Sequence, residues 1–142
     1  MIGRQVIEIN KEMSEGELEK FMQEHWDKIN FNDFIKAKPT PMSANEYICL
    51  PATPRFMVIV YPKKKFWIFS RKNKVVLSVC ETPSGVQGRI FTALPTHNVF
   101  FGAAKIGATF SLEDERRGPA EEVLQKYAKQ MKKILSDAGW IE

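Results

Sequence analysis

Two apolar runs without alternation constrain the fold of this chain more than any other feature. They are Phe56 to Tyr61 and Phe66 to Phe69. An antiparallel sheet with one face in water alternates apolar and polar side chains along each strand. The first run is apolar at both its even-numbered and its odd-numbered positions, which point to opposite faces of the sheet. We therefore expect both faces of its strand to be shielded from water. The residues of the two parities are Phe56, Val58 and Val60 on one side and Met57, Ile59 and Tyr61 on the other.

A block of basic residues surrounds the two runs. Residues 55–74 contain seven of the 21 lysines and arginines and no acidic residue, although the whole chain has a formal net charge of only +4. The positive charge is therefore local, and a local charge of this kind raises the question of an anionic partner. The seven residues are Arg55, Lys63, Lys64, Lys65, Arg71, Lys72 and Lys74.

Length and composition predict one domain over residues 1–142. A chain of this size can bury roughly two-thirds of the surface that it exposes when unfolded. No stretch approaches the roughly 18 apolar residues that a membrane helix requires, and the first ten residues lack a signal-peptide pattern. We therefore expect a cytoplasmic protein without a membrane partner. Cys49 and Cys80 lie in apolar segments, where an inert buried thiol is the commonest state and a single disulfide is the alternative.

Two helices are predicted. Ser14 and Glu17 form an S-x-x-E capping box, and an apolar stripe with intervals of three and four residues predicts a helix from Ser14 to Asn30. Phe31 to Ile35 is expected to add another turn, and the proline-containing segment Lys36 to Asn45 is expected to form a loop. A second stripe, with a proline at its start and Gly139 at its end, predicts a helix from Pro119 to Ala138. Its apolar positions include Leu124, Tyr127, Met131 and Leu135.

Strand signals fill most of the remaining chain. Short connections with proline, glycine or asparagine predict antiparallel hairpins in an up-and-down meander, with turns at Pro62 and Lys63 and at Lys72 and Asn73. The predicted strands are Gly3 to Ile9, Tyr47 to Leu50, Arg55 to Tyr61, Phe66 to Ser70, Val75 to Glu81, Gly88 to Leu94, and one or two between Val99 and Phe110.

This order of elements predicts an α+β fold: a strand, a helix, a meander of five to six antiparallel strands and a long C-terminal helix, with both helices on one face of the sheet. Two known architectures share that order. One is the helix-grip arrangement of the Bet v 1 and START-like proteins, and the other is the TBP-like half-domain, named for the TATA-binding protein. The likeness concerns topology alone, so no functional residue is transferred from either family.

The second sheet face leads to our first functional hypothesis. Helices can cover only one parity of Phe56 to Tyr61, so an internal pocket, a partner subunit or the loop from Lys36 to Asn45 must cover the other. We expect a non-enzymatic binding module that meets an apolar small molecule or a homo-oligomer partner there. The predicted ligand or interface residues are Met57, Ile59, Tyr61, Trp67, Ser78 and Cys80.

The basic block supports an alternative, a nucleic-acid or polyanion-binding domain. Cations interleaved with the rings of Phe66, Trp67 and Phe69 resemble a surface that binds single strands, although lysines at strand edges also protect against aggregation. The predicted polyanion-binding residues are Lys63, Lys64, Lys65, Arg71, Lys72 and Lys74.

A small enzyme is the third hypothesis. It ranks below the other two because no nucleophile or acid–base set can be assigned from the sequence. We predict no catalytic residues, no metal site and no cofactor. His25 and His97 lack the spacing of metal ligands. Gly102 and Gly107 have the spacing of a phosphate-binding loop, but the lysine that such a loop requires is absent.

Overall fold

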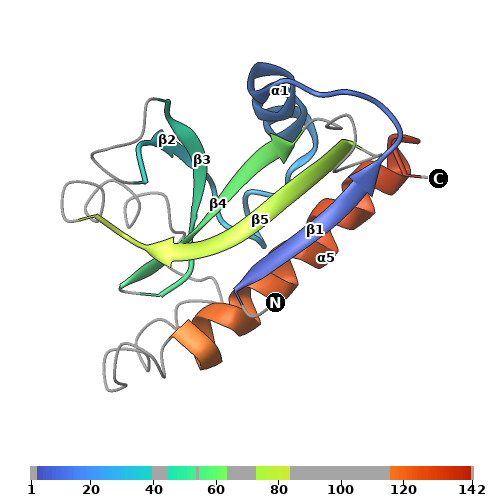
Figure 1. The fold of residues 1–142 in the computed structure, drawn as a ribbon. Coiled ribbons are helices and arrows are strands. Elements are labelled where there is room, and N and C mark those ends of the chain that lie inside the picture. Colours follow the sequence, from blue (N-terminus) through green and yellow to red (C-terminus); the bar gives the residue numbers. More distant parts are fainter. Residues whose placement is uncertain (1–2, 40–44, 54, 64–72, 84–115, 142) are drawn as a thin grey trace, which may run out of the picture.

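A computed structural model describes residues 3–39, 45–53, 55–63, 73–83 and 116–141 of this protein. These residues form five strands and two α-helices, which confirms the predicted α+β class (Figure 1). A single π-helical turn, Arg116–Ala120, precedes the second helix. In chain order the elements are β1 (Arg4–Ile9), α1 (Glu15–His25), β2 (Ile35–Ala37), β3 (Tyr47–Pro51), β4 (Phe56–Lys63), β5 (Asn73–Glu81) and α5 (Glu121–Asp137).

The five strands form one antiparallel sheet in the order β1-β5-β4-β3-β2. Strands β2 to β5 are neighbours in chain order, as in the predicted meander, and β1 closes the sheet beside β5. Direct pairing of β4 with β5 contradicts one prediction, because segment 66–70 was expected between them. The turn predicted at Pro62 and Lys63 is also wrong, since both residues belong to β4. Pro62 lies beyond Val60, where pairing with β3 ends, and a strand tolerates proline at such an unpaired edge.

Three predicted strands lie outside the described residues: Phe66 to Ser70, Gly88 to Leu94 and the segment between Val99 and Phe110.

The start of α1 follows the predicted capping box. The Ser14 hydroxyl accepts a hydrogen bond from the Glu17 amide at 3.1 Å, and the Glu17 carboxylate accepts one from the Ser14 amide at 3.4 Å. The helix ends at His25 rather than at Asn30, because the Asp27 carboxylate accepts amide hydrogen bonds from residues 29 and 30 and organises a turn there. Hydrogen bonds from the Asn30 side chain and backbone lower the pKa of Asp27.

The helical turn predicted for Phe31 to Ile35 is wrong. Asn32 has a left-handed φ of 66°, which ends any helix, and Ile35 begins strand β2. β2 also takes up Lys36 and Ala37, so the predicted loop begins later than expected.

Helix α5 matches its prediction closely. It begins two residues after Pro119, which lies in the π-helical turn, and ends at Asp137. Gly139 adopts φ 82°, the Gly139 amide donates to the Ser136 carbonyl at 3.0 Å, and the Trp140 amide donates to the Leu135 carbonyl at 2.9 Å. This pair of bonds is the Schellman motif, which a glycine after the last helical turn favours.

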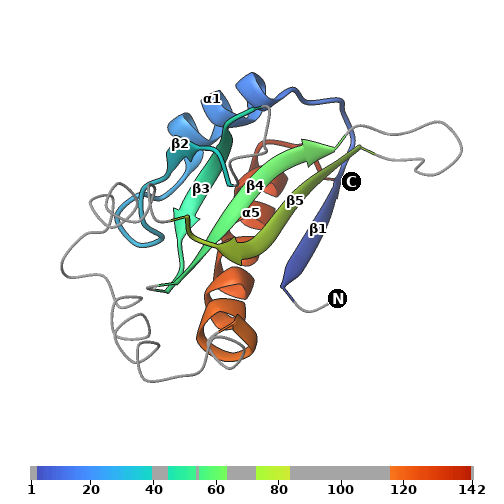
Figure 2. The same ribbon diagram turned by 60° about the vertical axis from the view of Figure 1, so that its left-hand side comes forward.

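Both helices pack on one face of the sheet, as predicted. Figures 1 and 2 show the strands in front of α5. The main core joins alternate residues of the strands to the apolar sides of both helices. From the sheet it includes Ile7, Ile9, Ile48, Leu50, Val58, Val60, Val75 and Leu77, from α1 it includes Leu18, Phe21 and Met22, and from α5 it includes Val123, Leu124, Tyr127, Met131, Ile134 and Leu135. Neither described helix combines the length and the apolar character that a membrane crossing demands.

Candidate functional site

The face of the sheet turned away from the helices, called the second face below, collects the predicted ligand residues. In the register of β4 and β5, Met57 pairs with Cys80 and Ile59 pairs with Ser78, while Tyr61 lies two residues further along the same face. Side chains of alternate strand residues share a face, so these five side chains form one continuous surface. Trp67, the sixth predicted residue, lies outside the described residues.

One buried cluster of the second face joins β2, β3 and β4. Met57 and Cys49 have no exposed surface, and Ala37 is 1% exposed. Ile35, Ile59 and Cys80 pack against this small cluster and are half-buried. The contribution of β2 was missing from the sequence-based expectation, because three residues are too short to show a periodic pattern.

Towards the other end, the second face carries two half-buried tyrosines, and Val76, the cross-strand partner of Tyr61, is fully buried. The Tyr47 and Tyr61 rings meet edge to face, with centroids 5.6 Å apart. Such pairs add attraction beyond the burial of their area. We expected every residue of β4 that points away from the helices to be buried. This holds for Met57 but only in part for Ile59 and Tyr61, which are half-buried.

Both cysteines of the second face are free thiols. Burial, aided by the negative charge of Glu81, raises the pKa of Cys80 to about 11. The Cys49 sulfur lies 3.4 Å from the Tyr47 carbonyl oxygen and 3.8 Å from that of Ala37, so its S–H has backbone acceptors. A thiol held in its neutral form is a poor nucleophile and a poor metal ligand, because both roles require the thiolate.

We expect Cys80 to be alkylated by iodoacetamide far more slowly in the folded protein than after denaturation, at about pH 8, because the thiolate is the reacting form. The folded thiol ionises near 11 and the unfolded one near its ordinary value of 9.0. As pH rises past the lower value, the unfolded state loses its proton first, so the protein should lose stability between these two values. Cys80→Ser is the control, since it should remove this part of the alkaline decline. Equal alkylation rates in the folded and denatured protein would contradict the prediction.

Lysines extend the second face at one end. Lys63 of β4 and Lys74 of β5 are direct cross-strand partners, and Glu8 of β1 lies opposite Lys74 on its other side. All three have the parity of the second face, so the apolar surface runs into a charged end. The other four predicted polyanion-binding residues lie outside the described residues: Lys64, Lys65, Arg71 and Lys72.

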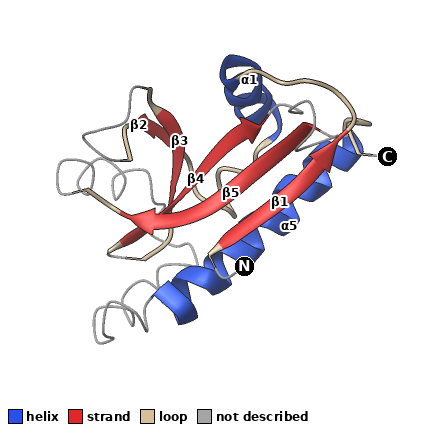
Figure 3. Ribbon diagram, viewed as in Figure 1, coloured by secondary structure: helices blue, strands red, loops and turns tan. Residues whose placement is uncertain are grey.

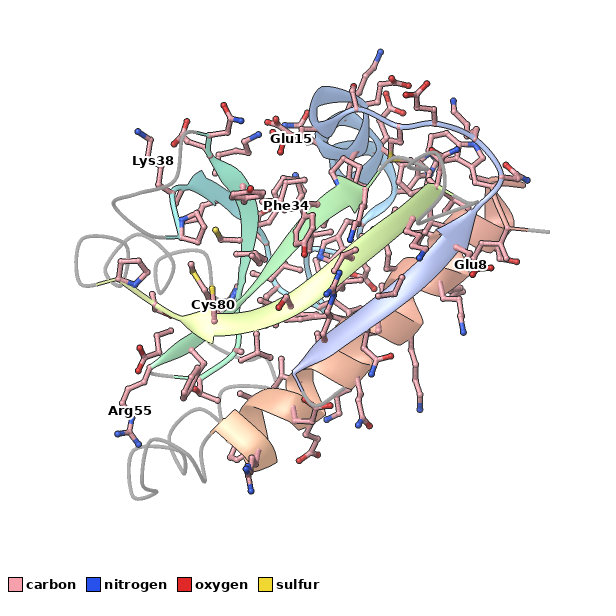
Figure 4. The ribbon with its side chains drawn as sticks, in the orientation of Figure 1. Glu8, Glu15, Phe34, Lys38, Arg55 and Cys80 are labelled. Atoms are coloured by element: carbon pink, nitrogen blue, oxygen red, sulfur yellow. The ribbon has the colours of Figure 1, made fainter. Side chains whose placement is uncertain are left out.

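Arg55 does not belong to this charged end. It precedes β4, and its carbonyl accepts a hydrogen bond from the Thr82 amide at the far end of β5. Eight residue steps along a strand separate it from Lys63, a distance of about 26 Å. Figure 4 shows Arg55 at one end of the sheet and Glu8, the register neighbour of Lys74, towards the other. Of the described residues of the basic block, Arg55 therefore lies at one end of the sheet, and Lys63 and Lys74 lie at the other.

A buried polar network on the helical side was not expected from the sequence. The Trp26 indole donates to the Asn32 carbonyl at 2.8 Å, the Asn32 side-chain amide donates to the Tyr127 hydroxyl at 2.9 Å, and that hydroxyl donates to the Pro51 carbonyl. Burial raises the pKa of Tyr127, which keeps the hydroxyl protonated as the donor to Pro51. The network joins the segment after α1 to α5 and β3, so we assign it a structural role. No sequence pattern marks an asparagine for such a position.

Metal ligation finds no support in the described ranges, where no three His, Cys, Asp or Glu side chains lie close enough together to hold an ion. His25 lies exposed on α1, on the other side of the sheet from Cys80, with its Nε2 atom 4.0 Å from the Glu24 carboxylate. His97, Gly102 and Gly107 lie outside the described residues.

No protein family, no curated protein and no solved structure matches this chain. The helix-grip-like and TBP-like topologies therefore stay predictions.

Proposed function

We propose that this protein is a non-enzymatic binding module whose second face takes up an apolar small molecule or a partner subunit. One observation supports the proposal: on the apolar face that neither helix covers, Ile59 and Tyr61 are only half-buried beside the fully buried Met57, so their remaining apolar surface is open to a partner. A sheet face exposed to water would instead carry polar side chains, because each strand would alternate apolar and polar residues.

The chemistry of the second face favours binding over catalysis. Its thiols are kept neutral by burial or lie beside backbone acceptors, so neither is prepared for attack on a substrate. What it offers is apolar area, and burial of such area is worth about 25 cal/mol per Å². Shape and apolar contact should therefore determine which partner fits.

Replacement of Ile59 by asparagine tests the proposal, because Ile59 is half-buried in the middle of the second face. Two measurements are needed: binding of Nile red, a neutral apolar dye, and the oligomeric state by sedimentation velocity. We expect Ile59→Asn to weaken dye binding or self-association by about tenfold, which corresponds to roughly 1.4 kcal/mol.

The matched control is Ile29→Asn, the same chemical change at a side chain that is 68% exposed and outside the second face. It should leave both measurements unchanged, and circular dichroism should show that both variants are folded. A wild-type protein that is strictly monomeric and binds no dye would exclude both forms of the proposal.

Binding of a nucleic acid or another polyanion is the second candidate function. It is favoured by the direct opposition of Lys63 and Lys74, since like charges facing each other across strands repel unless an anion lies between them. Glu8 offsets part of this repulsion from the other side of Lys74. Sedimentation velocity with an added single-stranded oligonucleotide at physiological salt tests this candidate. Absence of binding would exclude it. If the oligonucleotide binds, its affinity should fall steeply as the salt concentration rises.

A further inference from the structure

Strand β1 forms one edge of the sheet and has a groove beside it. It is the first strand in the sheet order and pairs with β5 alone among the described strands. Figures 2 and 3 show β1 at the margin of the sheet with α5 running alongside. A cavity of about 260 Å³ lies between the two elements, lined by residues 5–7 of β1 and by residues of α5 that include Ala128, Lys129 and Lys132. The groove borders α5, whereas the Val6 side chain has the parity of the second face, because Val6 and Tyr61 both pair with Val76.

The backbone of β1 can accept another strand on its outer edge. The Val79 amide donates to the Gly3 carbonyl at 2.8 Å, so the carbonyl of residue 3 points towards β5, as in a hydrogen-bonded pair of the ladder. Hydrogen-bonded and non-hydrogen-bonded pairs alternate along an antiparallel ladder. Residues 5, 7 and 9 therefore bond to β5, and the N–H and C=O groups of Arg4, Val6 and Glu8 point outwards. Val6 is 44% exposed, a value that among the large apolar side chains of the described ranges only Ile29 exceeds.

The charge of the groove is positive. Lys129 and Lys132 are exposed and are the charged residues among the described lining of the cavity. Neither makes an ion pair with any residue in the described part of the chain, whereas Lys126 on the same helix pairs with Glu122 at 3.8 Å. Two lysines without carboxylate partners beside an open strand edge are complementary to an acidic segment.

We propose that the β1 edge binds an extended acidic segment of a partner protein as a sixth strand of the sheet. Main-chain hydrogen bonds to Val6 and its neighbours would hold the segment, which is the usual mode of strand addition. Its side chains alternate, so those beside residues 5 and 7 point towards α5 and place carboxylates near Lys129 and Lys132. The side chain opposite Val6 lies on the other face and is apolar.

A second copy of this chain fits the edge less well. The Gly3 amide donates to the Glu121 carboxylate at 2.6 Å and the Asn10 amide to the Trp140 carbonyl at 2.9 Å, so β1 and α5 run in the same direction. Val6 then lies roughly level with Lys129. Antiparallel pairing of two β1 strands about Val6 would bring the Lys129 side chains of both copies together near the symmetry axis, and such juxtaposed like charges oppose association.

The test uses a fluorescein-labelled, end-capped peptide of alternating glutamate and valine, Glu-Val-Glu-Val-Glu, and measures fluorescence polarisation with the full chain. We expect Lys129→Gln combined with Lys132→Gln to weaken binding by about tenfold or more. The matched control, Lys126→Gln combined with Lys133→Gln, makes the same charge change on α5 outside the groove and should alter binding by less than about twofold.

Two further comparisons separate strand pairing from charge alone. N-methylation of both valines removes the amide donors of the peptide while keeping its charge, and it should abolish binding. Val6→Pro removes an outward N–H of β1, which an edge strand tolerates, and should have the same effect. If that variant is unfolded by circular dichroism, the lysine variants and the methylated peptide remain decisive.

Several results would overturn the proposal. They are no binding of the acidic peptide up to about 1 mM, equal binding of the methylated peptide, or equal binding to the two double lysine variants. A wild-type dimer that Val6→Pro dissociates, without any peptide binding, would assign the edge to a second copy of the chain instead.

Discussion

Truncation of Leu135 to alanine should lower the free energy of unfolding by about 2–5 kcal/mol. Leu135 has no exposed surface and lies in the core that joins α5 to the sheet and to α1. The loss combines the burial of the deleted methyl groups with the cavity that they leave, because the surrounding side chains relax only in part. The Leu135 carbonyl accepts the Trp140 amide in the C-terminal cap, and this backbone bond stays available in the variant.

Urea titration followed by circular dichroism measures the effect of Leu135→Ala. The matched control is Ile29→Ala, since Ile29 is 68% exposed and its truncation should change stability by less than about 0.5 kcal/mol. A loss for Leu135→Ala as small as that of the control would show that α5 is not docked on the sheet as described.

The elements with strong local signals were predictable from the sequence. Helix α5 has a wide apolar stripe and a glycine stop, and its predicted core residues are fully buried. The N-terminus of α1 depends on Ser14 and Glu17, which are three residues apart, so a local motif is enough to place it.

The errors arise where contacts distant in sequence decide the structure. Strand β2 forms because Ile35 pairs with Cys49 on β3. A pattern of three residues cannot predict such a pairing. The predicted end of α1 is too late because Ile29 fits the spacing of the apolar stripe, yet in the structure Ile29 is 68% exposed and lies within a turn that Asp27 organises.

The second face illustrates the same limit. Alternation along β4 correctly places Met57, Ile59 and Tyr61 on one face, because strand parity is a local property, whereas the pairing of Cys80 with Met57 depends on the register of β5. Which parity meets the helices was undetermined, since both are apolar, and the structure assigns Val58 and Val60 to the helical core. In the basic block, Arg55 immediately precedes β4 and Lys63 is its last residue, so the length of the strand separates these two cations.

Replacement of Tyr127 by phenylalanine should destabilise the protein by about 1–3 kcal/mol for each buried polar group left without its partner. The Tyr127 hydroxyl accepts from the Asn32 side chain and donates to the Pro51 carbonyl, and Tyr127 has no exposed surface. Water cannot easily replace the hydroxyl at such a buried position, so most of the penalty should remain. Tyr61→Phe is the matched control, since that ring is half-buried on the second face and its loss of a hydroxyl should cost less than about 0.5 kcal/mol.

Two measurements distinguish the loss of the network from a general loss of packing. Asn32→Gly keeps the left-handed backbone at φ 66°, so a double-mutant cycle with Tyr127→Phe isolates the side-chain coupling, expected at about 0.5–3 kcal/mol. Stability against pH provides the other. Burial raises the pKa of Tyr127 above its ordinary value of 10.0, so the unfolded state ionises first and wild-type stability should fall as pH rises past that value. Tyr127→Phe should lack this part of the alkaline decline, and a cycle with zero coupling together with an unchanged decline would show that the hydroxyl does not hold the segment after α1 to the core.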